Sequence, residues 1–289
     1  MASTIALKQR IKSVKGTRQI TKAMQLVSAS KMRRAQDQAF KSRAYRDVAY
    51  ELLSRLNTVK EVAREPMFRV RPVNSRLYIV ITSNSGLAGA YNANTLKLLF
   101  KGVKADQAAG IQSRVIAIGS KGAQFVRRLS EVELMAVYSA LGDHPSANDI
   151  RPVLNTMINE YKNELADDVQ IIYTNFKSNL IQEAQTIQLL PAKTDDIVEQ
   201  ADNVVMNFEP DVETVIEQVT TRLIEAQVWQ AVLESLASEH SMRMLAMKNA
   251  TDNAKDLIDD YTLELNTARQ ASITQELAEI TGGAEALNG

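Results

Sequence analysis

The feature that most restricts the fold of this chain is a long stretch without helix-breaking residues. Neither glycine nor proline occurs from residue 211 to residue 281, whereas all six prolines lie between residues 66 and 210. Because these two residue types most often interrupt helices, the distribution predicts one continuous helix over 211–281. With a rise of about 1.5 Å per residue, that helix would be on the order of 100 Å long, so it needs a partner along its length.

The residues within this stretch have the spacing of a coiled coil. Apolar and small side chains recur in alternating steps of four and three, which places them along one seam of a helix. The seam positions are His240, Met244, Met247, Thr251, Ala254, Ile258, Tyr261, Leu265, Ala268 and Ser272. The same register extends back to Val219, with Gln230 as its one polar entry there. Residues 1–60 hold shorter runs with steps of three or four, so we expect the two ends of the chain to pair as an antiparallel coiled coil.

Charge separates the two ends, although the net charge of the chain is zero. Residues 1–60 contain 14 Lys and Arg against 3 Asp and Glu (net +11), whereas residues 211–289 contain 5 against 14 (net −9). Flanking charges of opposite sign favour pairing of the two helices. Pairing does not account for the whole asymmetry, because Lys31, Arg33 and Arg34 have no acidic residue beside them in the sequence. We expect this cluster either to lie on a solvated face or to face an acidic partner protein.

The middle of the chain alternates between strand-like and helix-like segments. Strand-like runs lie at 76–82, 113–119, 132–138, 169–175 and 184–190, and helical stretches lie near 92–103, 121–130 and 147–165. This order predicts a mostly parallel sheet covered by helices, like half of a doubly wound fold. The predicted fold class is therefore α/β, with a long antiparallel coiled coil of the N- and C-terminal helices. The predicted domains are a coiled-coil helix (1–60), a central Rossmann-like α/β domain (61–210) and a second coiled-coil helix (211–289).

The segments in which a catalytic or cofactor site would lie do not have the spacing that such a site needs. The loop "SNSGLAGAYN" (83–92) contains G-x-x-G rather than G-x-G-x-x-G, and "GSKG" (119–122) lacks the spacing of a phosphate-binding loop. The chain has no cysteine, and its two histidines, His144 and His240, are not in metal-ligand spacing. We expect no catalytic centre, no cofactor and no metal. No apolar run approaches the roughly 18 residues of a membrane span, and we expect a mature cytosolic chain without a leader.

Four segments together resemble the gamma subunit family of the F-type ATP synthase. They are "QRIKSVKGTRQITKAMQLVSASKMRRAQ", "ITSNSGLAGAYN", "SEHSMRMLAMKNATDNA" and "ARQASITQELAEI", and they are spread over the whole chain. The resemblance implies a non-catalytic rotary shaft inside a hexamer of alpha and beta subunits, with the α/β body standing on a c ring beside the epsilon subunit. It also implies a peripheral protein on the cytoplasmic face of a bacterial cell membrane, because the two-cysteine segment of chloroplast members is missing.

The resemblance also implies roles for particular residues. A catch loop of a beta subunit would contact Arg269, Gln270, Thr274 and Glu276. The acidic levers of the beta subunits would face Met24, Lys31, Arg33, Arg34 and Arg243, for which a solvated face is the alternative. The c ring and epsilon subunit would contact Met206, Phe208 and Glu209. The glycine loop departs from the family pattern, because Asn84 and Ser85 replace an Asp–Arg pair and Ala88 replaces a frequent cysteine.

A tip that is small and polar suits a shaft that turns in a close sleeve. Orientation-specific burial of an apolar stripe would act as a barrier to rotation, at about 1.4 kcal/mol for each tenfold loss in rate.

Two alternative functions stay open. The basic residues 1–60 could bind nucleic acid, but they are not interleaved with aromatic residues. A Rossmann-like enzyme would need a cofactor loop, which the sequence lacks. We therefore expect protein partners and no nucleic acid.

Overall fold

The computed structural model describes residues 4–56, 65–139, 142, 145–192 and 212–288. Their contacts divide the chain into two units. The first, termed the coil unit, comprises Met1–Ser28 and Met244–Gly289, and the second, termed the sheet unit, comprises Ala29–Arg243. The helices α1 (Thr4–Leu56) and α5 (Val212–Asn288) contribute residues to both units. The contact boundaries therefore lie inside the two helices, and the domain limits at residues 60 and 210 stay a prediction.

Within the coil unit, α1 and α5 pair in antiparallel directions. The hydroxyl of Thr251 donates a hydrogen bond to that of Thr21 (2.8 Å), and the guanidinium of Arg10 lies 6.0 Å from the ring centre of Tyr261. The earlier residue of α1 thus meets the later residue of α5, which confirms the predicted antiparallel coil. The buried residues of this unit follow the predicted seam on α5 and a matching one on α1; they are Leu7, Ile11, Thr21, Ser28, Met247, Thr251, Ala254 and Ile258.

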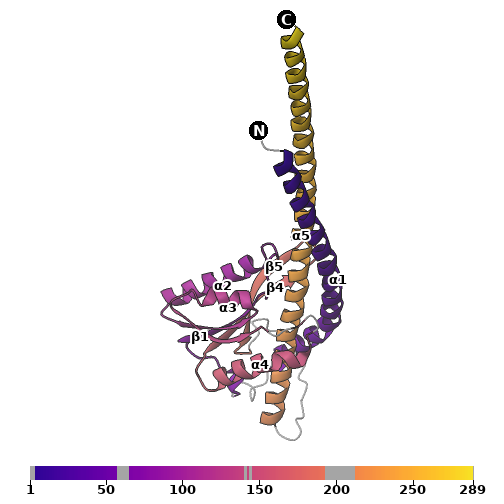
Figure 1. Ribbon diagram of the computed structural model, residues 1–289. Coiled ribbons are helices and arrows are strands. Elements are labelled where there is room, and N and C mark those ends of the chain that lie inside the picture. The colour runs from indigo at the N-terminus through magenta and orange to yellow at the C-terminus, as the bar shows by residue number, and fades with distance from the viewer. Residues whose placement is uncertain (1–3, 57–64, 140–141, 143–144, 193–211, 289) are drawn as a thin grey trace. The chain divides into compact units, whose positions relative to one another are not determined.

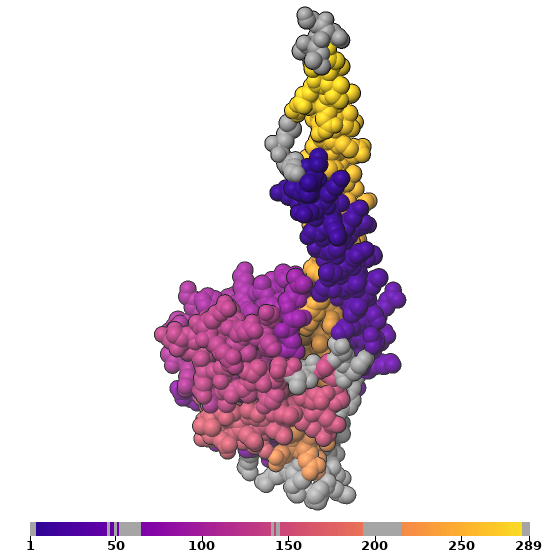
Figure 2. Space-filling model, viewed as in Figure 1, coloured from indigo at the N-terminus to yellow at the C-terminus, as the bar shows by residue number. Residues whose placement is uncertain are grey.

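The C-terminal part of α5 continues beyond the start of α1 within the coil unit (Figure 2). Tyr261, Leu265 and Ala268 are half-buried, and every residue from 269 to 284 is exposed. The seam therefore loses its cover at residue 269. The uncovered segment is not uniformly polar and small as predicted, because it exposes three large apolar side chains, Ile273, Leu277 and Ile280.

The sheet unit contains five strands in the order β3-β2-β1-β4-β5. Their bounds are Ser75–Ile81 (β1), Gln112–Ile118 (β2), Val132–Tyr138 (β3), Asp168–Phe176 (β4) and Gln182–Leu190 (β5). Strands β1 to β4 are parallel, and β5 pairs with β4 in the antiparallel direction. The last five residues of the central β1, Leu77–Ile81, are apolar or aromatic and buried, as expected for a strand covered on both faces, whereas the edge strand β5 is half polar. The predicted strand order along the chain is confirmed.

Helices cover both faces of this sheet (Figure 1). Alternate residues of β1 point to opposite faces. Tyr78 and Val80 pack with α2 (Tyr91–Ala108) and α3 (Ser120–Val126). Leu77, Ile79 and Ile81 belong to the cluster of α4 (Ala147–Lys162) and the first part of α5. A short 3-10 helix, η2 (Pro66–Phe68), adds Met67 and Phe68 to the same cluster. The first part of α5 is thus a core element of the sheet unit.

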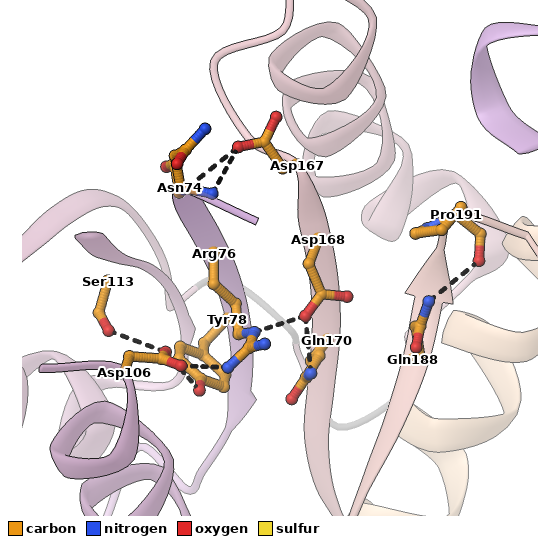
Figure 3. A network of polar contacts seen from close by, with 11 residues as sticks. Asn74, Arg76, Tyr78, Asp106, Ser113, Asp167, Asp168, Gln170, Gln188 and Pro191 are labelled. Carbon is orange, nitrogen blue, oxygen red and sulfur yellow. Dashed lines mark hydrogen bonds and ion pairs between the residues drawn. The ribbon is translucent and has the colours of Figure 1, made fainter. Parts of the chain in front are cut away.

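A buried polar network joins the amino-terminal ends of β1 and β4 to the end of α2 (Figure 3). Arg76 of β1 forms ion pairs with both Asp106 and Asp168. Asp106 also accepts hydrogen bonds from the hydroxyls of Tyr78 (2.7 Å) and Ser113 (3.1 Å). Burial raises the pKa of Asp168 and of Tyr78, and the charge of Arg76 opposes both shifts. This anchoring of Asp106 accounts for an α2 that continues to residue 108, five residues past the predicted end.

Candidate functional site

The loops that follow β1 and β2 meet at the carboxyl edge of the sheet, where open α/β sheets commonly bind ligands. A cavity of about 160 Å³ lies beside them in the sheet unit. Its walls come from these loops, from α1 and from α5, and its polar lining includes Lys31, Asn84, Ser85, Tyr91, Ser235, Glu239, His240 and Arg243. The structure therefore brings two residues of the predicted lever group, Lys31 and Arg243, to one cavity.

The amide groups at the start of α3 have acceptors within the chain. Ser120 N donates to Asn84 Oδ1 (3.0 Å), Lys121 N to the carbonyl of Ser83 (3.1 Å) and Gly122 N to the hydroxyl of Thr82 (2.8 Å). Gly119 has φ 98, and a Cβ there would lie 2.1 Å from the carbonyl oxygen of Thr82. The segment "GSKG" is therefore a close junction of two loops, and these three amides are not directed at a phosphate.

Side chains of α5 fill the crevice between β1 and β4, where the strand order reverses. The hydroxyl of Ser235 accepts from Thr174 N (3.1 Å), and that of Ser238 donates to the carbonyl of Thr174 (3.3 Å). The hydroxyl of Thr95 in α2 lies 3.1 Å from that of Thr174. Tyr91 is fully buried beside them, and burial raises the pKa of its hydroxyl. In doubly wound folds a nucleotide lies in this crevice, whereas α5 occupies it here.

Arg243 is the most constrained charged residue of the cavity. Its side chain is only 9% exposed. Nη1 donates to Glu239 Oε1 (2.6 Å) and lies 3.4 Å from His240 Nδ1. Nη2 donates to the hydroxyl of Ser85 (3.0 Å) and lies 3.4 Å from the carbonyl oxygens of Ser85 and Gly86. The guanidinium thus joins α5 to the glycine loop.

The other residues predicted to contact partners are more exposed. In the sheet unit, Lys31 is half-buried, and Arg33 and Arg34 are exposed. In the coil unit, Met24 is half-buried on α1. The predicted catch residues Arg269, Gln270, Thr274 and Glu276 are exposed on α5. The predicted foot residues Met206, Phe208 and Glu209 lie outside the described residues.

The polar seam position Gln230 has a structural explanation. Its side-chain amide donates to Glu234 Oε1 (2.7 Å) and to the carbonyl of Ala39 in α1 (3.4 Å). Arg43 of α1 places Nε 3.5 Å from the same Glu234 oxygen and donates through Nη2 to the carbonyl of Phe176 (2.8 Å). A buried polar residue in a seam restricts the register of two helices. Gln230 therefore holds α1 and α5 in one register in the sheet unit.

Sequence reasoning missed the internal partners of Arg243. The signal for Glu239 was present, because a Glu four residues before an Arg lies on the same helix face. The signal for Ser85 was not, because Arg243 and Ser85 are 158 positions apart.

Over the described ranges, no helix has the length and apolar character needed to cross a membrane. The same ranges contain no cluster of three or more His, Cys, Asp or Glu that could hold a metal ion.

Comparisons with known proteins all find components of ATP synthases. The fold recurs in solved ATP synthases. A chain of the Euglena gracilis mitochondrial ATP synthase (OSCP, F1 and c-ring) aligns with a TM-score of 0.69 at 19% identity, covering 98% of this chain and 94% of that one. A chain of the central stalk and c-ring of the Tetrahymena thermophila mitochondrial enzyme gives a TM-score of 0.61 at 22% identity, covering 80% and 99%.

Sequence relatives narrow the class further. The family model described as ATP synthase matches residues 3–287. The ATP synthase gamma chain of Herpetosiphon aurantiacus is 41% identical, and that of Psychrobacter arcticus is 38% identical, each covering 100% of both chains. The chain therefore belongs to the family of ATP synthase gamma chains.

Proposed function

We propose that the chain is the central rotary shaft of an F1Fo ATP synthase. It couples rotation of a c ring, driven by ion flow, to conformational changes in an alpha/beta hexamer that synthesises or hydrolyses ATP. The observation that carries this proposal is 41% identity to a gamma chain over the full length of both proteins. The antiparallel coil and the uncovered end of α5 support it, because a shaft needs both stiffness and a slim tip.

In this proposal the shaft performs no chemistry, and catalysis takes place on the beta subunits. The complex holds the chain on the cytoplasmic face of a bacterial cell membrane as a peripheral protein. Met206, Phe208 and Glu209 contact the c ring and the epsilon subunit. The proposal requires low barriers to rotation, since each 1.4 kcal/mol of barrier slows rotation about tenfold.

Two groups of residues act on the beta subunits. Arg269, Gln270, Thr274 and Glu276 form transient hydrogen bonds with a catch loop, which their full exposure permits. Met24, Lys31, Arg33, Arg34 and Arg243 act on the acidic levers. The two exposed arginines of this group can contact a partner directly, whereas the burial of Arg243 favours an indirect contribution.

Reconstitution tests the proposal. The purified chain is mixed with the alpha and beta subunits of the same organism, and ATP hydrolysis and bead rotation are recorded. We expect no hydrolysis by the chain alone and unidirectional rotation in the mixture. Hydrolysis by the isolated chain, or a hexamer that turns over ATP equally well without it, would overturn the proposal.

A further inference from the structure

The glycine loop of residues 84–90 is held from two sides. On one side, Arg243 of α5 contacts the hydroxyl and carbonyl of Ser85 and the carbonyl of Gly86. On the other side, Asn84 accepts from the backbone N (3.0 Å) and hydroxyl (3.2 Å) of Ser120 and donates to the carbonyl of Ser139 (3.0 Å). The first residues of the loop, 84–86, are thus tied to α5 and to α3.

Directly after these anchored residues, the loop presents one apolar side chain, Leu87, to solvent. Leu87 is 62% exposed and has φ 62, in the left-handed region that a branched side chain rarely adopts. Ala88 and Tyr91, the next anchors along the loop, are each only 1% exposed. The surroundings therefore hold an unfavourable backbone conformation whose result is an exposed leucine.

The guanidinium of Arg243 is oriented to contact both α5 and the glycine loop. Glu239, one turn earlier on α5, forms an ion pair with Nη1, and the planar fork of the guanidinium then directs Nη2 at the loop. A lysine has a single ammonium group and cannot reproduce this two-sided geometry. The donors of Arg243 are thus used between two parts of the same chain.

We propose that Arg243 is a positioning residue that fastens the glycine loop to α5 and thereby fixes the apex at Leu87. Its influence on the levers of the beta subunits passes through the loop and does not require direct contact. This consequence rests on the proposed shaft function. The fastening itself belongs to the isolated chain, so the two can be tested separately.

The fastening is tested by labelling the loop apex. Because the chain has no cysteine, Leu87→Cys introduces a single thiol for a nitroxide label, whose motion is read by EPR on the full-length chain. We expect Arg243→Gln to shift the spectrum toward faster motion, and Arg243→Lys to fail to restore it. The matched control is Arg222→Gln, which removes an exposed arginine that pairs with Glu225 on the same helix. An unchanged spectrum in Arg243→Gln would overturn the proposal.

Ser85→Ala provides a second variant that leaves the ion pair of Arg243 with Glu239 in place. We expect a smaller shift than in Arg243→Gln, and no further shift when the two changes are combined, because both act on one contact. Additive shifts would mean that Arg243 and Ser85 act independently, contrary to the proposal. Matching far-ultraviolet circular dichroism of each variant shows that it is folded.

Hydrolysis by the reconstituted complex tests the consequence. If Arg243 acts through the loop, Ser85→Ala lowers the rate in part and adds nothing to the loss in Arg243→Gln. A different outcome is that Arg243→Gln lowers the rate, Ser85→Ala does not, and the EPR spectrum of the loop label is unchanged in both variants. Arg243 then contacts a partner directly, and the positioning role is wrong. Failure of every preparation, including the parent, to rotate would instead count against the shaft function and leave the EPR result standing.

Discussion

At the scale of single residues, two arginines of the sheet unit each have several partners. Arg76 lies between two carboxylates, and Arg243 lies between Glu239 and the oxygens of Ser85. Breaking a buried pair by removing one partner costs about 3–5 kcal/mol, because the remaining charge is left unsatisfied. Both arginines join segments far apart in the sequence, so each stabilises tertiary structure more than its own element.

The raised pKa of Tyr161 predicts that the protein loses stability at alkaline pH. Burial raises its pKa to about 12, although the nearby charge of Arg71 opposes the shift, and its hydroxyl donates to the carbonyl of Arg69 (2.8 Å). Because the folded-state pKa lies above the unfolded value of about 10, this contribution is complete below pH 10 and is lost as the pH rises toward 12. Urea unfolding at several pH values should show a shallower decline for Tyr161→Phe than for the parent. Parallel declines would contradict this assignment.

The proposed catch contacts predict that changes near the C-terminal end of α5 impair the complex more than changes earlier on the same helix. Replacing Arg269 and Gln270 together by Ala should impair assembly or turnover of the complex, at about 0.5–1.5 kcal/mol for each lost partner hydrogen bond. The control replaces Asp256 and Asp259, which are exposed earlier on α5, by Ala. Hydrolysis and synthesis rates of the two complexes give the comparison. A normal tip variant beside a defective control would show that the catch residues are wrongly assigned.

At the scale of elements, the sequence predicts what depends on local pattern. Buried parallel strands carry apolar runs and a long helix lacks glycine and proline, so the element order and the seam from Met247 to Ile258 could be predicted. Element ends depended on tertiary contacts: α2 continues to residue 108 because Asp106 binds Arg76. The helix near 121–130 ends at Val126, where a turn follows. The link between Arg243 and Ser85 had no local signal.

The pairing of α1 and α5 predicts a specific cross-link. The hydroxyls of Thr21 and Thr251 are in contact and buried in the coil unit. In a chain without other thiols, Thr21→Cys with Thr251→Cys should oxidise to one intramolecular disulfide, seen as a mobility change on non-reducing gels. The matched control pairs Thr21→Cys with Thr262→Cys, about three helical turns away on α5. Equal cross-linking of both pairs would rule out a fixed register.

At the scale of the whole molecule, both terminal helices contribute to both units. α1 and α5 each belong partly to the coil unit and partly to the sheet unit. Neither terminal helix can therefore be removed without changing the sheet unit, whose core includes the first part of α5.

The proposed role of residues 206–209 leads to the prediction that a change there impairs assembly on membranes only. Phe208→Asp should weaken assembly of the complex on membranes containing Fo, because a charge would replace an apolar contact with the c ring. Assembly of the soluble complex with alpha and beta subunits should stay at the parental level. Co-sedimentation with membranes and gel filtration measure the two steps. Equal loss of both would identify Phe208 as a core residue of the chain itself.

The packing of α5 in the sheet core has a consequence for synthesis on the ribosome. Residues from Ile216 to Val232 cover one face of strands that are translated much earlier, and they belong to the last helix, of 77 residues. At about 5–20 residues per second, the first 21 residues of that helix, Val212 to Val232, take roughly 1–4 s to translate. During this interval the nascent sheet lacks the helical segment that completes its core, so one apolar face of the sheet has no cover. The core of the α/β body, although most of it lies in the middle of the chain, is complete only after the first part of α5 emerges.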